Sequence, residues 1–309
     1  MTSQSIPMAG SGRAERVPLR LRLAQRGLDG VTLLVLPAAL FIVLLFVYPF
    51  LYGMTLSVQP KGGAETVGRF ANYARFFSDP FLYDTILTTL KLALPVTIIN
   101  VVMSIPVAMR VRLMRRQRLL TTILVLPVTL GAVLVAEGLL NYLGPQGWLN
   151  RTLMTFGLVS SPVRLVHNYW GVFIALIIHS FPFTFLLTLS YVSGVDPSLE
   201  QAASTLGAGP RARFRHVILP LLLPGLAITF CLSFVQDFAV FPSAVLLGAP
   251  AGPTRVISIA AYQAAFEEYD YSMASAIAMI MGFVQLLIVV TVLTSRGLFY
   301  RGPAAGGKG

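Results

Sequence analysis

Six long apolar stretches constrain this chain more than any other feature of its sequence. Each runs for about 20 residues with few charged side chains, and a helix of that length crosses a hydrocarbon core of about 30 Å. Within hydrocarbon, only helices and closed barrels satisfy every backbone polar group. The sequence therefore predicts an all-α, polytopic membrane protein with six transmembrane helices, expected over residues 31–51, 84–108, 119–143, 170–192, 217–246 and 273–294.

The composition agrees with this class and argues against a soluble protein. Hydrophobic residues make up 56% of the 309 residues and charged residues only 11%, whereas soluble domains average about 25% charged residues. A single cysteine, Cys231, excludes a disulfide framework and a thiolate metal site. The three histidines lie far apart in the sequence and none has an HExxH-type spacing, so we expect no metal site.

The basic residues are divided unevenly between two alternating sets of connecting segments. The set that includes both ends of the chain holds 16 lysines and arginines, and the opposite set holds 6. Because cytoplasmic loops carry the excess of positive charge, both termini are expected in the cytoplasm. The same asymmetry explains the net charge of +11 without a nucleic acid as partner, and the basic segments can also meet anionic lipid head groups.

We expect three parts along the chain. A cytoplasmic tail covers residues 1–29, the six-helix domain covers residues 30–294, and a second cytoplasmic tail covers residues 295–309. The chain lacks a GxxxxGK[ST] sequence for binding nucleotide phosphates. If transport through this protein uses ATP, another polypeptide must hydrolyse it.

The segment between the fourth and fifth stretches, residues 195–216, carries the most informative local pattern. Asp196 followed by Pro197 is typical of a helix N-cap and the first helical residue. Glycines at 207 and 209, with Pro210, are expected to end this short helix. A second, basic helix then begins near Pro210 and enters the membrane. The sequence therefore predicts a short helix that lies across the cytoplasmic face.

This loop resembles the EAA loop of the integral-membrane permease subunits of binding-protein-dependent ABC importers. That motif reads EAA, three residues, Gly, nine residues, and then I-x-LP. Gln201 stands where the family has Glu, Glu200 lies one place earlier, and Val217 replaces Ile, while the spacing is kept throughout. The matching positions are Gln201, Ala202, Ala203, Gly207, Val217, Leu219 and Pro220.

The resemblance implies a bundle like that of type I ABC importer permeases, in the bacterial inner membrane and without enzyme activity of its own. The implied partners are two copies of an ATPase subunit that binds ATP and Mg, a second permease subunit, and a periplasmic substrate-binding protein. No cofactor is expected on this chain. The loop is expected to be a coupling helix that docks into the ATPase, through Glu200, Gln201, Ala202, Ala203, Gly207, Leu219 and Pro220.

Four polar residues inside the apolar stretches are candidates for the substrate pathway: Glu137, His179, Gln236 and Asp237. Ionisable groups at membrane depth are costly and usually face a bundle interior or water. At ~1.5 Å per residue, Glu137 and Asp237 both lie about 27–30 Å from the inner ends of their helices. Two acids in the outer leaflet favour a cationic solute.

A weaker resemblance points to the same solute class. The Asp237 region, the Leu-Gly-Ala-Pro turn after it and residues 269–276 are similar to the spermidine/putrescine branch of these permeases. Branches that carry iron, thiamine, phosphonates or sugars share this layout. The solute therefore stays open, as does the choice between a homodimer and a heterodimer of permeases.

Two other classes of function remain as alternatives. A secondary transporter or channel acting alone could use Glu137, Asp237 and His179 as an ion relay, but it has no need of the loop at 195–216. A membrane enzyme needs a clustered nucleophile, base or metal set, and the sequence shows none.

Overall fold

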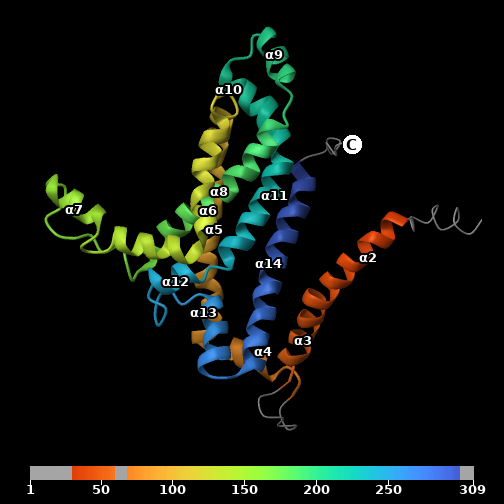
Figure 1. Cartoon of the computed structure of the whole chain (residues 1–309), viewed down its shortest axis with the longest axis vertical. Coiled ribbons are helices and arrows are strands. Elements are labelled where there is room, and N and C mark those ends of the chain that lie inside the picture. Colours follow the sequence, from red (N-terminus) through yellow and green to blue (C-terminus); the bar gives the residue numbers. More distant parts are fainter. Residues whose placement is uncertain (1–29, 60–67, 300–309) are drawn as a thin grey trace, which may run out of the picture. The chain divides into compact units, whose positions relative to one another are not determined.

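The structure, a computed structural model, describes residues 30–59 and 68–299 (Figure 1). The described residues form helices joined by turns and loops, without strands. The predicted N-terminal tail, residues 1–29, and residues 300–309 of the C-terminal tail lie outside the described residues. Contacts within the chain define two compact units, one that ends at Thr55 and one that begins at Leu56.

The all-α prediction is confirmed. Six helical stretches in the described part of the chain are long and apolar enough to cross a membrane: Leu34–Ser57, Pro80–Val111, Gln117–Thr155, Tyr169–Ser193, Pro210–Phe238 and Tyr271–Ser295. The first stretch consists of α2 (Gly30–Ile42), the π-helical turn η1 (Val43–Val47) and α3 (Tyr48–Ser57). The first unit therefore contains most of one predicted span, and the second unit contains the other five.

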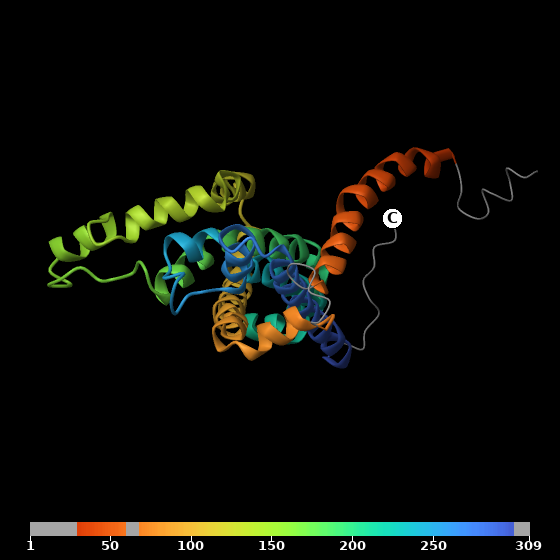
Figure 2. The same ribbon diagram turned by 90° about the horizontal axis from the view of Figure 1, so that it is seen from below.

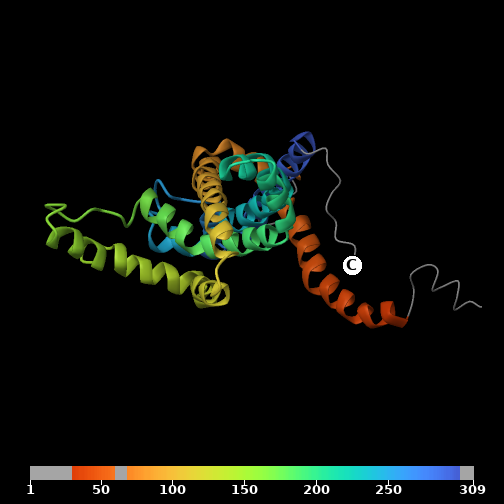
Figure 3. The same cartoon turned by 90° about the horizontal axis from the view of Figure 1, so that it is seen from above.

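The second unit is built around three helices, α5 (Pro80–Val111), α8 (Tyr169–Ser193) and α11 (Leu219–Phe238), which pack side by side (Figures 1 and 3). The remaining helices are α4 (Ala71–Ser78), α6 (Gln117–Leu143), α7 (Trp148–Thr155), α9 (Pro197–Thr205), α10 (Pro210–Arg213), η3 (Phe214–Ile218), α12 (Pro242–Leu246), α13 (Ile257–Tyr262), η4 (Gln263–Glu267) and α14 (Tyr271–Phe299). In Figure 1, α9 and α10 lie at one end of the three-helix core, and α4 and α13 lie at the other.

Apolar clusters fill both ends of this core. Near α4 and α14, the fully buried side chains of Phe76, Phe234 and Ile277 pack together. Near α9, Phe185 and Leu222 are buried in a second cluster with residues of α5. Apolar packing therefore reaches both ends of the three-helix core.

The third predicted span is broken in its middle. Gly131 of α6 has φ 78° and ψ 159°, a conformation that is open essentially only to glycine. Beyond it, the second half of α6 leads with α7 away from the three-helix core (Figure 2). The expected continuous helix over 119–143 was wrong in this respect, so the depth of Glu137 cannot be counted along a straight axis.

The fifth span ends earlier than predicted. α11 stops at Phe238, and residues 242–246 form the separate helix α12. Pro242 has no amide hydrogen to donate, and it disfavours a helical conformation at Phe241, which has φ −137°. The expected helix over 217–246 was therefore wrong at its C-terminal end.

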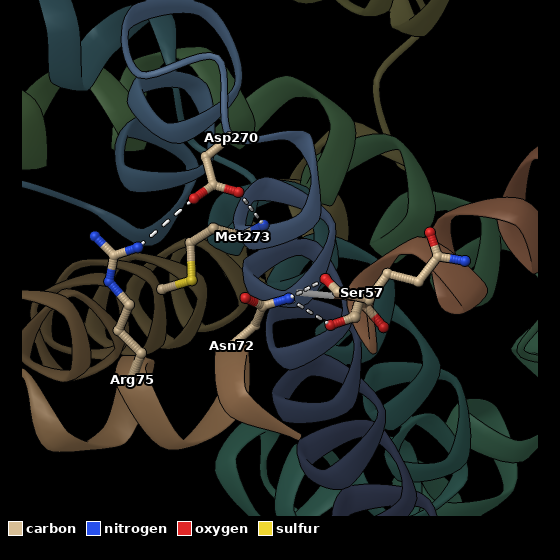
Figure 4. A network of polar contacts seen from close by, with 6 residues as sticks. Ser57, Asn72, Arg75, Asp270 and Met273 are labelled. Carbon is tan, nitrogen blue, oxygen red and sulfur yellow. Dashed lines mark hydrogen bonds and ion pairs between the residues drawn. The ribbon is translucent and has the colours of Figure 1, made fainter. Parts of the chain in front are cut away.

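A polar network ties α4 to the segment before it and to the start of α14 (Figure 4). Asn72 donates hydrogen bonds from Nδ2 to the backbone oxygens of Ser57 and Gln59, at 3.0 and 2.9 Å. Arg75 lies 3.6 Å from a carboxylate oxygen of Asp270. The other carboxylate oxygen of Asp270 accepts a hydrogen bond from the backbone amide of Met273 at 3.0 Å, which caps α14. These contacts fix the end of the core that lies opposite α9.

We predict that Gly131→Ala destabilises the protein by about 1–3 kcal/mol, because a Cβ is strained at this backbone conformation. The measurement is the thermal unfolding midpoint in detergent. Gly138→Ala is the matched control, since Gly138 lies in the same helix with open space around its Cβ position, and it should keep or raise the midpoint. Equal midpoints for the two variants would contradict the assignment of the break to Gly131.

Candidate functional site

The predicted short helix in the 195–216 loop is confirmed as α9. Its N-cap is Asp196, whose carboxylate accepts a hydrogen bond from the backbone amide of Ser198 at 2.8 Å, and Pro197 is the first helical residue. This hydrogen bond lowers the pKa of Asp196 below its ordinary value. Side-chain capping at this end satisfies one of the amides that an α-helix leaves unpaired.

Glycine ends α9, as the sequence predicted. Gly207 has φ +82°, and the amide of Ala208 donates to the oxygen of Ala203 at 3.0 Å. This bond and the one from Gly207 to Ser204, also 3.0 Å, are those of a helix closed by a left-handed residue. α10 then begins at Pro210 and continues through η3 into α11. A displacement of this loop is therefore passed along a continuous helical segment into the core.

The surface of α9 is open to a partner. None of its residues is buried, and Gln201, Ala202 and Ser204 are exposed. Just after its end, Leu206 is 88% exposed. The side chains of α9 and of the residue after it are therefore accessible.

Glu200 is the exception, because its carboxylate is already engaged. It forms an ion pair with Arg112, the residue that follows α5, and the two side chains are 24% and 10% exposed. Arg112 also donates a hydrogen bond from Nη1 to the backbone oxygen of Val192 in α8, at 3.3 Å. Sequence reasoning missed Arg112; its position among arginines directly after a predicted span gave no sign of a partner 88 residues away.

The last two motif residues lie where the loop joins the core. Leu219 and Pro220 are half-buried at the start of α11, beside the buried Ile218. Ile218 packs in the apolar cluster that contains Phe185 of α8. The end of the motif therefore anchors the loop in the three-helix core.

The four pathway candidates lie in different surroundings. Asp237 is 1% exposed and accepts a hydrogen bond from the Thr97 hydroxyl at 2.7 Å. Gln236 and Glu137 are exposed, and His179 is half-buried with a buried Nδ1 that has no hydrogen-bond partner. The structure does not bring these four side chains into one hydrogen-bonded cluster. Within the described residues, no three His, Cys, Asp or Glu side chains converge to hold a metal ion.

A charged residue that sequence reasoning passed over lies at the opposite end of the core. Arg255, only 7% exposed, lines an open pocket of about 410 Å³ together with Asp84 at the start of α5. Its guanidinium lies 4.0 Å over the Phe81 ring and donates from Nε to Gln263 at 2.9 Å. Burial lowers the pKa of Arg255, and the nearby Glu268 acts in the other direction. The Nε donor and one face of the guanidinium are therefore already engaged within the protein.

Comparison of sequences gives one family and a group of relatives. Residues 94–301 match the family described as binding-protein-dependent transport system inner membrane component. A probable sulfate transport system permease protein, cysT of Prototheca wickerhamii, is 33% identical over 177 residues, 57% of this chain and 67% of the relative. The spermidine/putrescine transport system permease protein PotB of Salmonella typhimurium is 30% identical over 179 residues, 57% of this chain and 62% of PotB. The chain thus spans about two thirds of these relatives' length.

Solved structures show the same fold. A chain from the crystal structure of a bacterial alginate ABC transporter, in complex with an alginate pentasaccharide-bound periplasmic protein, superposes with a TM-score of 0.76 at 22% identity. The match covers 92% of this chain and 99% of that chain. A chain of the MetNI methionine ABC transporter, in an inward-facing conformation, gives a TM-score of 0.56 at 16% identity over 71% and 96% of the two chains.

We predict that Asp196→Ala frays the first turn of α9, because the capping oxygen is lost, while Asp196→Asn keeps the turn folded. Hydrogen exchange of the backbone amides at 198–200 measures the effect and should be faster in the alanine variant only. Because the pKa of Asp196 is lowered in the fold, the extra stability of its charged form is present above the ordinary aspartate pKa. It is lost as the pH falls through the lowered value. Unchanged exchange in the alanine variant would contradict the capping role.

Proposed function

Since the chain belongs to the family of binding-protein-dependent transport system inner membrane components, we propose that it is the transmembrane permease subunit of an ABC importer. It forms the pathway for a small solute that a periplasmic binding protein delivers. The observation that carries this proposal is α9: a helix capped at both ends, exposed on its surface, and joined by a short turn to the continuous helical run of α10, η3 and α11.

The energy source in this proposal is a separate pair of ATPase subunits, which bind ATP and Mg. The coupling helix α9, with the motif residues Gln201, Ala202 and Ala203 at or near its surface, docks into a groove on one ATPase subunit. Closure of the ATPase pair then shifts the equilibrium between inward-facing and outward-facing arrangements of the helices. A second permease subunit completes the pathway. The alginate ABC transporter named above, whose structure includes a periplasmic protein, supports the periplasmic partner.

A transporter that acts alone is the second candidate. Its ion relay needs Glu137, His179 and Asp237 to exchange protons, yet Glu137 is exposed while Asp237 is buried beside Thr97. Uptake into proteoliposomes distinguishes the two proposals, because only an ABC importer requires ATP and the ATPase subunit for uptake.

We predict that Ala203→Arg and Gly207→Asp each lower ATP-driven uptake by roughly tenfold or more, a loss within the usual range of coupling between sites. Arginine adds bulk and charge to the docking helix, and aspartate adds a negative charge at the C-terminal end of that helix, where the helix dipole disfavours it. Uptake in proteoliposomes and the amount of inserted protein are measured together, and insertion should be unchanged. Gly207→Asn is the control, since asparagine tolerates the left-handed conformation. Full uptake by Ala203→Arg would remove the basis for docking through α9.

For the solute, we propose a polyamine-like cation. The 30% identity to PotB and the acidic residues of the pathway candidates support this class. Sulfate is the competing solute, because cysT is similar to the same extent. Asp237 is buried between helices, so it can meet a solute only when α11 and α5 separate, and alternating access requires such a motion.

We predict that Asp237→Asn weakens transport of a cation by about tenfold, equivalent to ~1.4 kcal/mol, while ATP hydrolysis by the complex persists. The reason is loss of attraction between a carboxylate and an amine. Uptake of labelled spermidine and of labelled sulfate is compared in the same vesicles. Normal spermidine uptake by the variant, or sulfate-specific uptake by the wild type, would contradict the cation assignment and leave the permease assignment standing.

Both termini are proposed to be cytoplasmic. We predict that a cysteine replacing Arg164, in a Cys231→Ser background, reacts with an impermeant maleimide added outside the cell, whereas a cysteine replacing Ser204 does not. Both positions are exposed in the structure, so reaction depends on the side of the membrane rather than on burial. Labelling of the cysteine at 204 alone would reverse the topology.

A further inference from the structure

We propose that Arg112 is a positioning residue that transmits the movement of the coupling helix α9 to α5 and α8. This inference rests on the proposed function and adds a second mechanical connection to it. The first connection is the chain itself, which joins α8 to α9 through residues 194–196 and α9 to α11 through residues 206–209, α10 and η3. The second is the ion pair between Arg112 and Glu200.

One guanidinium joins three elements. Arg112 follows directly after the last residue of α5, pairs with Glu200 of α9, and donates from Nη1 to the backbone oxygen of Val192 near the end of α8. Glu200 is the one acidic residue of α9. Any displacement of α9 therefore acts on the ends of α5 and α8 as well as on α11.

The surroundings commit Arg112 to this role. Its side chain is 10% exposed, and its buried Nε has no hydrogen-bond partner. A guanidinium that is largely removed from water needs a counter-charge, and Glu200 supplies it. In the described segment 110–118 the other four arginines, Arg110, Arg115, Arg116 and Arg118, are exposed, so Arg112 alone among them is placed between helices.

The two connections together determine how α9 moves. The covalent connections attach α9 to the core by two short loops, residues 194–196 and 206–209, and neither loop joins it to α5. The ion pair also attaches Glu200 of α9 to the residue that follows α5, so that a displacement of α9 is shared by all three core helices. Without the ion pair, the ATPase should therefore hydrolyse ATP while less solute is transported per ATP hydrolysed.

The test uses the complex reconstituted with its ATPase and binding protein. Arg112→Glu and Glu200→Arg are each made alone and then combined, and Arg115→Glu is the matched control because Arg115 is exposed. The probe is labelled spermidine or labelled sulfate, whichever the wild-type complex takes up, and the amount taken up per ATP hydrolysed should fall roughly tenfold in each single variant, within the usual range of coupling between sites. The combined exchange should restore most of it, and the control should match the wild type. The ATPase should co-purify with the Arg112→Glu and Arg115→Glu variants.

Glu200→Gln guards against misfolding in the charge-reversal variants, since it keeps the size of the side chain and removes only the charge. It should also lower uptake per ATP hydrolysed. An unchanged ratio in Glu200→Gln, or single-variant losses that the combined exchange fails to restore, would overturn the inference. Absence of ATP-driven uptake in the wild-type complex would instead contradict the proposed function.

Discussion

Hydrogen bonds between buried polar side chains hold the three core helices together, and the rest of the second unit is arranged around that contact. Lipid chains are as apolar as leucine, so close packing and interhelical hydrogen bonds drive association, each such bond contributing about 0.6 kcal/mol on average. Four of them join α5, α8 and α11, at 2.7–2.8 Å: Thr97 with Asp237, Asn100 with Ser180, Ser104 with Thr188, and Thr184 with Ser233. They determine which faces of the helices meet.

The contacts at the ends of the core follow from this packing. At one end, α5 and α8 finish close enough together for Arg112 to reach Val192 and Glu200. At the other end, α4 is attached to the start of α14 through Arg75 and Asp270. Between the two ends, Asp237 is buried in the contact between α5 and α11. We give the name seam to the surface where α5, α8 and α11 meet through the four hydrogen bonds named above. A motion that separates α5 from α11 must therefore break the Thr97–Asp237 hydrogen bond, which costs free energy.

Local signals in the sequence predicted most of what is local in the structure. Apolar length gave the six spans, and Asp196 with Gly207 gave both ends of α9, because each depends on neighbouring residues only. The break at Gly131 was missed since hydropathy does not register backbone conformation, and Pro242 was overlooked as the limit of α11. The Arg112–Glu200 pair joins residues 88 positions apart. The serines and threonines of the seam carry no charge and lie within apolar stretches, so the sequence does not mark them as interacting residues. Their partners are seen only in the packed structure.

Coupling in the proposed importer depends on docking of α9 onto a separate ATPase subunit. The most direct measurement is a cross-link from α9: Leu206, which is 88% exposed, is replaced by cysteine in a Cys231→Ser background and treated with a short bifunctional maleimide in membranes that contain the ATPase. We expect a cross-linked product with the ATPase, whose yield changes when ATP is added. A cysteine replacing Arg164 should give none. Cross-linking at 164 and none at 206 would contradict the account.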